Sequence, residues 1–105
     1  MIEQDTVLTK YRTAIRELFG ARIERIVLYG SRARGDAEPD SDYDIAVFLS
    51  DLQNRFQEGR QVADVELCIM DDTDAIVHTL LFPAGYWQDR SSPLMSEIRN
   101  DGLDL

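Results

Sequence analysis

Asp42 and Asp44 stand two residues apart at the start of the apolar run 45–49. Residues two apart in a strand point to the same face, so we expect the two carboxylates to lie side by side. Adjacent carboxylates repel each other, and a hard divalent cation such as Mg²⁺ removes that repulsion. Because Mg²⁺ completes its shell with water and phosphate oxygens, the pair predicts a magnesium site that also takes a phosphorylated ligand. The alternative is a pair of exposed acids at the end of a strand.

A Gly-Ser turn lies before the two acids in the sequence, and a short polar loop separates the turn from them. Gly30 and Ser31 follow the apolar run 25–29 directly. Glycine permits close approach of a ligand to the backbone, and the turn offers N–H groups and a hydroxyl to phosphate oxygens. An ordinary turn between two elements is the alternative. Together with the two acids, the turn indicates a site for a nucleoside triphosphate.

The motif residues occur in a fixed order: Gly30-Ser31, then Ala33-Arg34-Gly35, then Ser41-Asp42-Tyr43-Asp44. This order resembles the minimal nucleotidyltransferases of the DNA polymerase β superfamily. The resemblance implies that Asp42 and Asp44 hold Mg²⁺ and that Gly30, Ser31 and Arg34 bind the nucleotide. For Arg34 two roles stay open, contact with phosphate or an ion pair with an acid such as Asp36. We expect Arg32 to be exposed to solvent.

The resemblance also implies a third carboxylate, on a neighbouring strand, as a metal ligand and base. The candidate is Asp74, at the start of a strand predicted over residues 75–82, and we assign it to the catalytic and metal-binding set with Asp42 and Asp44. Nearer the middle of that strand the position is Ile76, which cannot bind metal. His78 shares the parity of Asp74 and could face the site, although a single histidine in a strand is more often structural.

Periodicity predicts an α/β or α+β fold, a small sheet with helices packed on it. The resemblance implies the polymerase-β-like nucleotidyltransferase fold, with a mixed sheet and a single domain over residues 1–105. The predicted helices cover residues 6–19 and, with Ser92 as N-cap, 93–100, and the predicted strands cover 22–29, 41–50 and 75–82. The loop 30–41 either has no regular structure or includes one helical turn after Ser31.

The segment 54–72 has two interpretations. A strand over 62–70 would place Asp64 and Glu66 on one face as further candidates for the third carboxylate. A helix fits the spacing better, and its buried face is predicted to hold one apolar stripe. The residues of that stripe are Leu52, Phe56, Ala63, Leu67 and Met70, with Cys68 in the core or half-buried.

The composition limits the kinds of molecule that the protein is expected to bind. Eleven basic residues against twenty acidic ones give a formal charge of −9, which argues against a nucleic-acid surface and suits a small substrate with a metal or a basic protein partner. A single cysteine excludes an intramolecular disulfide and is typical of the cytoplasm. We see no signal peptide in residues 1–6 and no run long enough to span a membrane.

The resemblance implies a reaction as well as a fold: Mg²⁺-dependent transfer of a nucleoside monophosphate, AMP from ATP, to a hydroxyl group. Such proteins often stand beside a HEPN-domain toxin, which implies an antitoxin role with a protein acceptor. The alternative is a binding module of the same fold that neutralises its partner by direct contact, with weak or no catalysis. Without a third acid, the protein would still bind nucleotide and Mg²⁺, but the rate of nucleotidyl transfer would be severely reduced.

Overall fold

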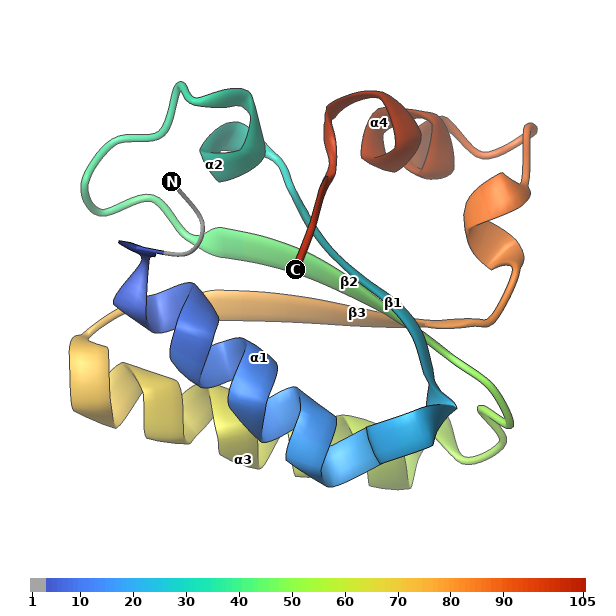
Figure 1. The fold of residues 1–105 in the computed structure, drawn as a ribbon, viewed down its shortest axis with the longest axis horizontal. Coiled ribbons are helices and arrows are strands. Elements are labelled where there is room, and N and C mark those ends of the chain that lie inside the picture. The colour runs from blue at the N-terminus through green and yellow to red at the C-terminus, as the bar shows by residue number, and fades with distance from the viewer. Residues whose placement is uncertain (1–3) are drawn as a thin grey trace.

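The computed structural model describes residues 4–105, whose strands form one mixed four-stranded sheet (Figure 1). β1 (Ile23–Tyr29) and β2 (Tyr43–Leu49) lie antiparallel at its centre. β3 (Val77–Pro83) runs parallel to β2 at one edge, and β4 (Leu103–Asp104), which the sequence did not predict, pairs with β1 at the other. The predicted mixed sheet is confirmed.

Helices cover both faces of this sheet. α1 (Thr6–Phe19) and α3 (Arg55–Thr73) lie together on one face, while α2 (Ser31–Arg34) and α4 (Pro93–Asp101) lie on the other (Figure 1). Short 3-10 turns, Gly20–Arg22 and Tyr86–Gln88, follow α1 and β3. No helix among residues 4–105 is long and apolar enough to cross a membrane. The first residues of the predicted domain 1–105, and of the segment 1–6 in which no signal peptide was seen, lie outside the described residues.

α1 confirms the helix predicted over residues 6–19, and local sequence signals account for both of its ends. The Asp5 side chain accepts a hydrogen bond from the Leu8 amide at 3.1 Å and so caps the helix. Gly20 ends it at φ +56, a conformation that glycine adopts at low cost. The helix buries one apolar stripe against the sheet, formed by Leu8, Tyr11, Ile15 and Phe19.

The alternation of side chains along β2 separates two cores. Tyr43, Ile45 and Val47 face α1 and α3, whereas Ala46 and Phe48 face α4. All five are buried, so β2 is covered on both sides over most of its length. Only the start of the strand, around Asp42 and Asp44, is half-exposed.

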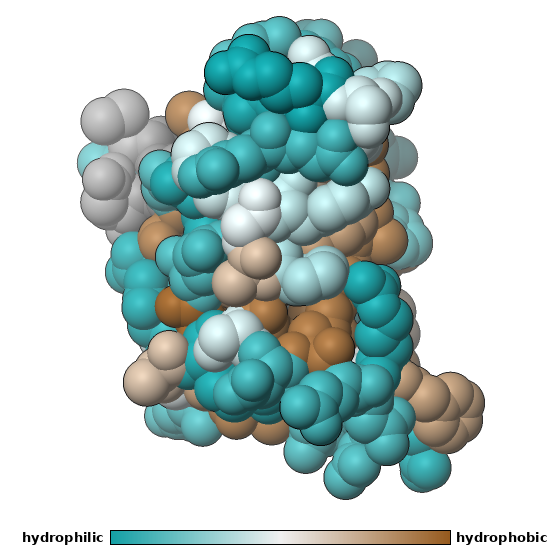
Figure 2. Space-filling model, turned by 90° about the vertical axis from the view of Figure 1, so that its right-hand side faces the viewer, coloured by the Kyte–Doolittle hydropathy of each residue, from teal (hydrophilic) through white to brown (hydrophobic). Residues whose placement is uncertain are grey.

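α3 confirms the predicted helix over residues 54–72 and excludes the alternative strand over 62–70. The predicted buried stripe, however, is wrong: Val62 and Ile69 are buried, while Phe56 and Leu67 are 78% and 55% exposed. Cys68 is exposed as well, contrary to prediction. Elsewhere, Figure 2 shows hydrophobic residues exposed among hydrophilic ones below the middle of the face that lies on the right of Figure 1. Apolar spacing therefore predicted the helix but not which side of it the sheet would cover.

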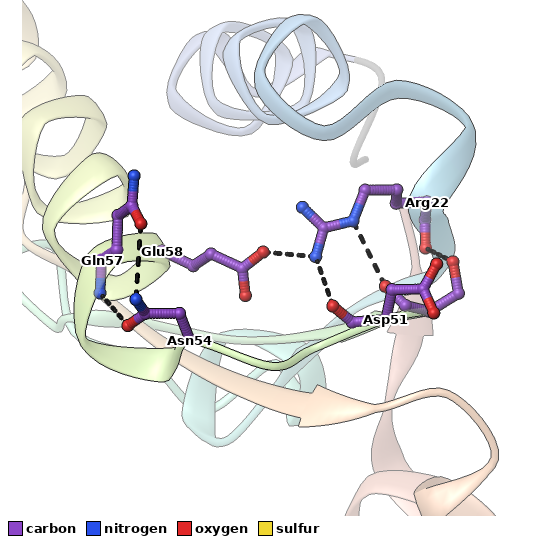
Figure 3. A network of polar contacts seen from close by, with 6 residues as sticks. Arg22, Asp51, Asn54, Gln57 and Glu58 are labelled. Carbon is purple, nitrogen blue, oxygen red and sulfur yellow. Dashed lines mark hydrogen bonds and ion pairs between the residues drawn. The ribbon is translucent and has the colours of Figure 1, made fainter.

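A polar network fixes the far end of β2, where the chain turns toward α3 (Figure 3). The Arg22 guanidinium donates to the Ser50 and Asp51 carbonyls at 3.2 and 3.1 Å and forms an ion pair with Glu58. The Asn54 side chain accepts from the Gln57 amide at 3.0 Å and so caps α3. This network ties β1, the turn after β2 and α3 together.

Candidate active site

Asp42 and Asp44 lie at the start of β2, on the face that α2 and α4 flank. Tyr43, between them, is buried in the core on the opposite face, so the two acids project together as predicted. Asp44 pairs with Tyr29 of β1 on one side and with His78 of β3 on the other. The register of three strands therefore fixes where the second carboxylate stands.

Gly30 brings the Gly-Ser turn directly against Asp44. Its φ is +76, and a Cβ added there would lie 2.6 Å from the Asp44 Oδ2 atom. A residue with a Cβ at this position would force the Asp44 carboxylate to shift, because real Cβ atoms do not approach another heavy atom so closely. The turn and the carboxylate, fourteen residues apart in the sequence, thus meet at one point.

The turn continues into α2, the single helical turn that the sequence left open. The Gly30 carbonyl accepts hydrogen bonds from the Ala33 and Arg34 amides, both at 3.1 Å. The Ser31 hydroxyl forms no hydrogen bond with another of residues 4–105, so it can still donate to a ligand. Arg34 takes the second of its two predicted roles here, with ion-pair distances of 3.4 Å to both Asp36 and Glu97.

Arg32 supports the site through contacts with the loop 35–41, although the sequence predicted it to be exposed to solvent. Its guanidinium donates to the Ser41 carbonyl at 2.8 and 3.0 Å and to the Pro39 carbonyl at 3.1 Å. It also stacks over the Tyr43 ring, 4.0 Å from the centroid. Arg32 therefore holds the loop that delivers Asp42. No spacing rule predicts this, because the carbonyls that it binds become neighbours only when the loop folds back.

The pKa of Asp44 reflects its half-buried position next to Asp42. Burial raises the pKa of Asp44, and the charge of Asp42 raises it further, while His78 and Arg34 lower it in part. Burial and the neighbouring Asp44 and Glu97 charges raise the pKa of Tyr29 to about 12. The site thus carries negative charge that its own residues do not fully compensate.

His78 contacts the site, as its parity with Asp74 allowed, although a single histidine in a strand is more often structural. Its Nε2 lies 2.9 Å from the Asp42 Oδ2 atom. His78 and Asp44 are also register partners across the parallel pair of strands. The alternation of side chains along the predicted strand allowed His78 to face the site. The pairing of β3 with β2 shows that it does.

Asp74 does not join the other two predicted carboxylates. It is the C-cap of α3, with φ +62, and α3 covers the opposite face of the sheet. It lines a pocket of about 610 Å³ together with Arg32, Ser41 and Tyr43, and neither Asp42 nor Asp44 lines that pocket. Among residues 4–105, no three His, Cys, Asp or Glu side chains form a group that could hold a metal ion as they stand. Asp74 as a metal ligand stays a prediction, which this arrangement does not support.

The family model of the nucleotidyltransferase domain matches residues 8–82, which include Gly30, Ser31, Asp42, Asp44 and His78. The chain belongs to the nucleotidyltransferase domain family. The protein adenylyltransferase MntA of Thermococcus cleftensis is 40% identical over 50 residues, which are 48% of this chain and 48% of that protein. The match thus spans about half the length of this curated relative.

Two solved structures share the nucleotidyltransferase fold. One is a crystal structure of a toxin-antitoxin with AMP-PNP, with a TM-score of 0.63 and 23% identity, covering 91% of this chain and 69% of that one. The other is a tri-AMPylated Shewanella oneidensis HEPN toxin in complex with an MNT antitoxin, with a TM-score of 0.51 and 19% identity, covering 94% and 71%. At these identities the likeness extends to the fold alone.

Nucleotidyltransferases generally use a divalent metal and ATP, and the donors of this chain fit such an ion. Asp42 and Asp44 offer carboxylate oxygens on one face, and the raised pKa of Asp44 reflects a charge that a cation would stabilise. Hard divalent cations prefer oxygen ligands.

Proposed function

We propose that this nucleotidyltransferase is a Mg²⁺-dependent adenylyltransferase that moves AMP from ATP to a hydroxyl group of a partner protein and thereby acts as its antitoxin. The observation that carries the proposal is the contact of Gly30 with Asp44. This contact supports the proposal because a turn suited to phosphate lies against Asp44, one of the two carboxylates that would hold the metal.

In this reaction the acceptor hydroxyl gives its proton to solvent as its oxygen bonds to the α-phosphorus, the bond from that phosphorus to the α,β-bridging oxygen breaks, and pyrophosphate leaves. Asp42 and Asp44 would hold the cation, which when bound neutralises the charge that develops on the phosphates. The Gly30-Ser31 turn would orient the triphosphate through the Ser31 hydroxyl. Arg32 keeps the loop before Asp42 in place.

Arg34 has a suitable position to contact the outgoing pyrophosphate. Its side chain is 40% exposed, and its ion pairs with Asp36 and Glu97 are long, at 3.4 Å each. Exposed ion pairs of this kind contribute little stability, so an incoming phosphate can displace them at low cost. Arg34 would then leave its acids and bind the nucleotide.

The proposed partner is a HEPN-domain toxin. The Thermococcus relative is described as a protein adenylyltransferase, and the Shewanella HEPN toxin carries AMP groups in complex with its antitoxin. The charge of −9 supports a protein partner with basic surface over a nucleic acid. A single domain over residues 1–105 and a place in the cytoplasm belong to the same proposal. Transfer is favoured over neutralisation by contact alone, because both relatives are described by adenylylation.

Labelled ATP tests this function directly. The purified chain is incubated with ATP labelled at the α-phosphate, Mg²⁺ and the HEPN-domain protein encoded beside it. We expect the label on the partner and its loss in the double variant Asp42→Asn, Asp44→Asn. The matched control is Glu38→Gln, Asp40→Asn, which removes two charges from the exposed part of the same loop and should still transfer label. A tight complex without label from the unaltered chain would overturn the proposal in favour of a pure binding module.

A further inference from the structure

We propose that the outer face of α3 is a docking surface for an amphipathic helix of the partner protein, with Lys or Arg residues along one flank of that helix. The outer face consists of an apolar stripe and two acids beside it: Phe56, Ala63, Leu67, Met70, Asp64 and Asp71. This inference rests on the proposed function only for the identity of the partner. It goes further by assigning the surface that holds the partner, which is separate from the catalytic site.

The outer face of α3 carries an apolar stripe that lies outside the core. Phe56, Leu67 and Met70 are 78%, 55% and 40% exposed, and Ala63 is exposed between the first two. The four residues are spaced by seven, four and three positions, so they lie on one side of the helix. The opposite side of α3 already fills the core with β-branched residues. A helix with apolar residues on two opposite sides has one side left for a second protein surface.

A hollow beside Phe56 has the form that receives a side chain from a second helix. Its volume is about 240 Å³, and it is lined, besides Phe56, by Gln57, Arg60, Gln61 and Asp64. These four positions are i, i+3, i+4 and i+7 of one helix. They are the positions that form the hole for a knob when two helices pack against each other. The hollow therefore favours a helix as the occupant of this surface.

The free edge of β3, next to α3, is closed to the other common mode of docking, the addition of a strand. Alternate residues of a strand direct their backbone groups to opposite edges, and Ile76 directs its carbonyl to β2. Thr79 and Leu81 therefore direct theirs to the free edge. There the Glu66 carboxylate accepts from the Thr79 amide at 2.9 Å. The Arg55 guanidinium donates to the Leu81 carbonyl at 3.1 Å. An added strand would have to break both bonds, so helix packing is favoured.

The charge of this surface favours a basic partner helix over a second copy of the chain. Asp64 and Asp71 lie three positions before and four after Leu67, so they border the stripe on one side. Neither carboxylate forms an ion pair with another of residues 4–105. In an antiparallel pair of two copies, this acidic border would face itself, and each copy carries a charge of −9. Lys or Arg side chains of a partner helix would instead pair with both aspartates.

The outer face of α3 and the catalytic site lie on opposite sides of the molecule. α3 covers one face of the sheet, whereas Asp42 and Asp44 project on the face that α2 and α4 flank (Figure 1). A partner helix seated on α3 therefore leaves the catalytic site open to the acceptor hydroxyl. It follows that docking and transfer are separable, and that the complex should persist in a chain that cannot transfer AMP.

Titration calorimetry with the HEPN-domain protein encoded beside this chain tests the surface. The double variant Phe56→Ala, Leu67→Ala removes two exposed apolar side chains, and we expect the Kd of the complex to rise about 30-fold or more. Asp64→Lys should raise the Kd about tenfold. The matched control is Glu17→Lys, an equal change of charge at an exposed position of α1, which should change the Kd less than about threefold. All of these residues are exposed, so circular dichroism should show the same fold in every variant.

Cys68 gives a direct probe of where the partner binds. It is exposed, and it lies four positions after Asp64 and three before Asp71. We expect alkylation of its thiol by iodoacetamide, followed through the mass of this chain, to be lost in the complex. The double variant Asp42→Asn, Asp44→Asn should bind the partner with an unchanged Kd and show the same protection of Cys68.

The outcomes separate this inference from the proposed function. If the chain transfers AMP but its complex is unaffected by the α3 substitutions and leaves Cys68 reactive, the inference fails alone. It also fails alone if label is transferred and no stable complex forms. A complex that depends on α3, with no transfer of label, supports the inference and overturns the proposed function. Sedimentation of the chain without partner is the last arm. Self-association that is lost in Phe56→Ala, Leu67→Ala would assign the surface to a second copy and overturn the inference.

Discussion

The two ends of β2 handle charge in opposite ways. At its start, Asp42 and Asp44 stand together on one face, and burial and mutual repulsion raise the pKa of Asp44. Beyond its end, the Glu58 carboxylate is only 12% exposed but has a cation beside it, Arg22, which also binds two carbonyls of the turn (Figure 3). One end leaves negative charge for a ligand to neutralise, and the other neutralises its own. The contrast separates a binding site from a structural joint on the same strand.

The largest expected effect comes from exchanging one carboxylate at each end. Asp42→Asn should lower the single-turnover rate of transfer by about 10³-fold or more, because it removes a ligand of the cation that stabilises the transition state. Glu58→Gln, an equal change at the other end, should leave that rate within about twofold once the folded fraction is taken into account. Equal losses in the two variants would show that the two ends do not differ as proposed.

Gly30→Ala should come next, because an added Cβ would push the Asp44 carboxylate out of its place. The added atom would lie 2.6 Å from Asp44 Oδ2, and with the positive φ we expect a loss of about 3 kcal/mol in unfolding free energy. Transfer by the folded fraction should also fall at least tenfold.

Gly35→Ala is the matched control for Gly30→Ala. Gly35 has φ +86 and no heavy atom within 4 Å of an added Cβ. It should lose about 1 kcal/mol from backbone strain alone. Chemical denaturation of the two variants measures the difference. Equal losses would mean that the Asp44 contact adds nothing.

Arg22→Ala tests the structural end of β2. It leaves the mostly buried Glu58 carboxylate without its cation and frees two carbonyls, so we expect a loss of about 2 kcal/mol. Lys10→Ala removes a cation from a pair with Asp72 in which both side chains are well exposed, 41% and 58%, and should lose less than about 0.5 kcal/mol. Urea unfolding measures both. If Arg22→Ala costs no more than Lys10→Ala, the network is not a structural joint.

The smallest expected effect is on stability at the start of β2. Unlike the substitutions above, this one should make the protein more stable. The pKa of Asp44 is raised in the folded state, so its contribution to stability is lost as the pH rises through that folded pKa. At pH 7, Asp44→Asn should therefore raise the melting temperature, by roughly 1–3 °C because solvent screens this half-exposed group.

The gain should disappear below the unfolded pKa of 3.8. Millimolar Mg²⁺ should stabilise the unaltered protein and not the variant, by linkage of binding to folding. Thermal scans at several pH values, with and without the metal, measure both effects. A variant less stable than the unaltered protein at pH 7 without metal would contradict the charge imbalance.

The sequence determined the features that depend on neighbours along the chain. The apolar stripe of α1 and the glycine that ends it are local, so the helix was predicted to the residue; the Asp5 cap is also a local signal but was not predicted. The side-by-side carboxylates followed from the two-residue repeat of a strand. The Gly-Ser turn and its single helical turn were also within reach, because turn geometry depends on a few consecutive residues.

Only the tertiary structure decided which faces meet. α3 carries two apolar stripes, either of which could face the sheet. The β-branched Val62, Val65 and Ile69 pack against it, while Phe56 and Leu67 are exposed. Side-chain packing, and not spacing along the helix, selects the buried face. Likewise, His78 rather than Asp74 reaches Asp42, because the parallel register of β3 beside β2 sets that pairing. A single-residue change of register would send His78 to the opposite face, and no local pattern in the sequence fixes that choice.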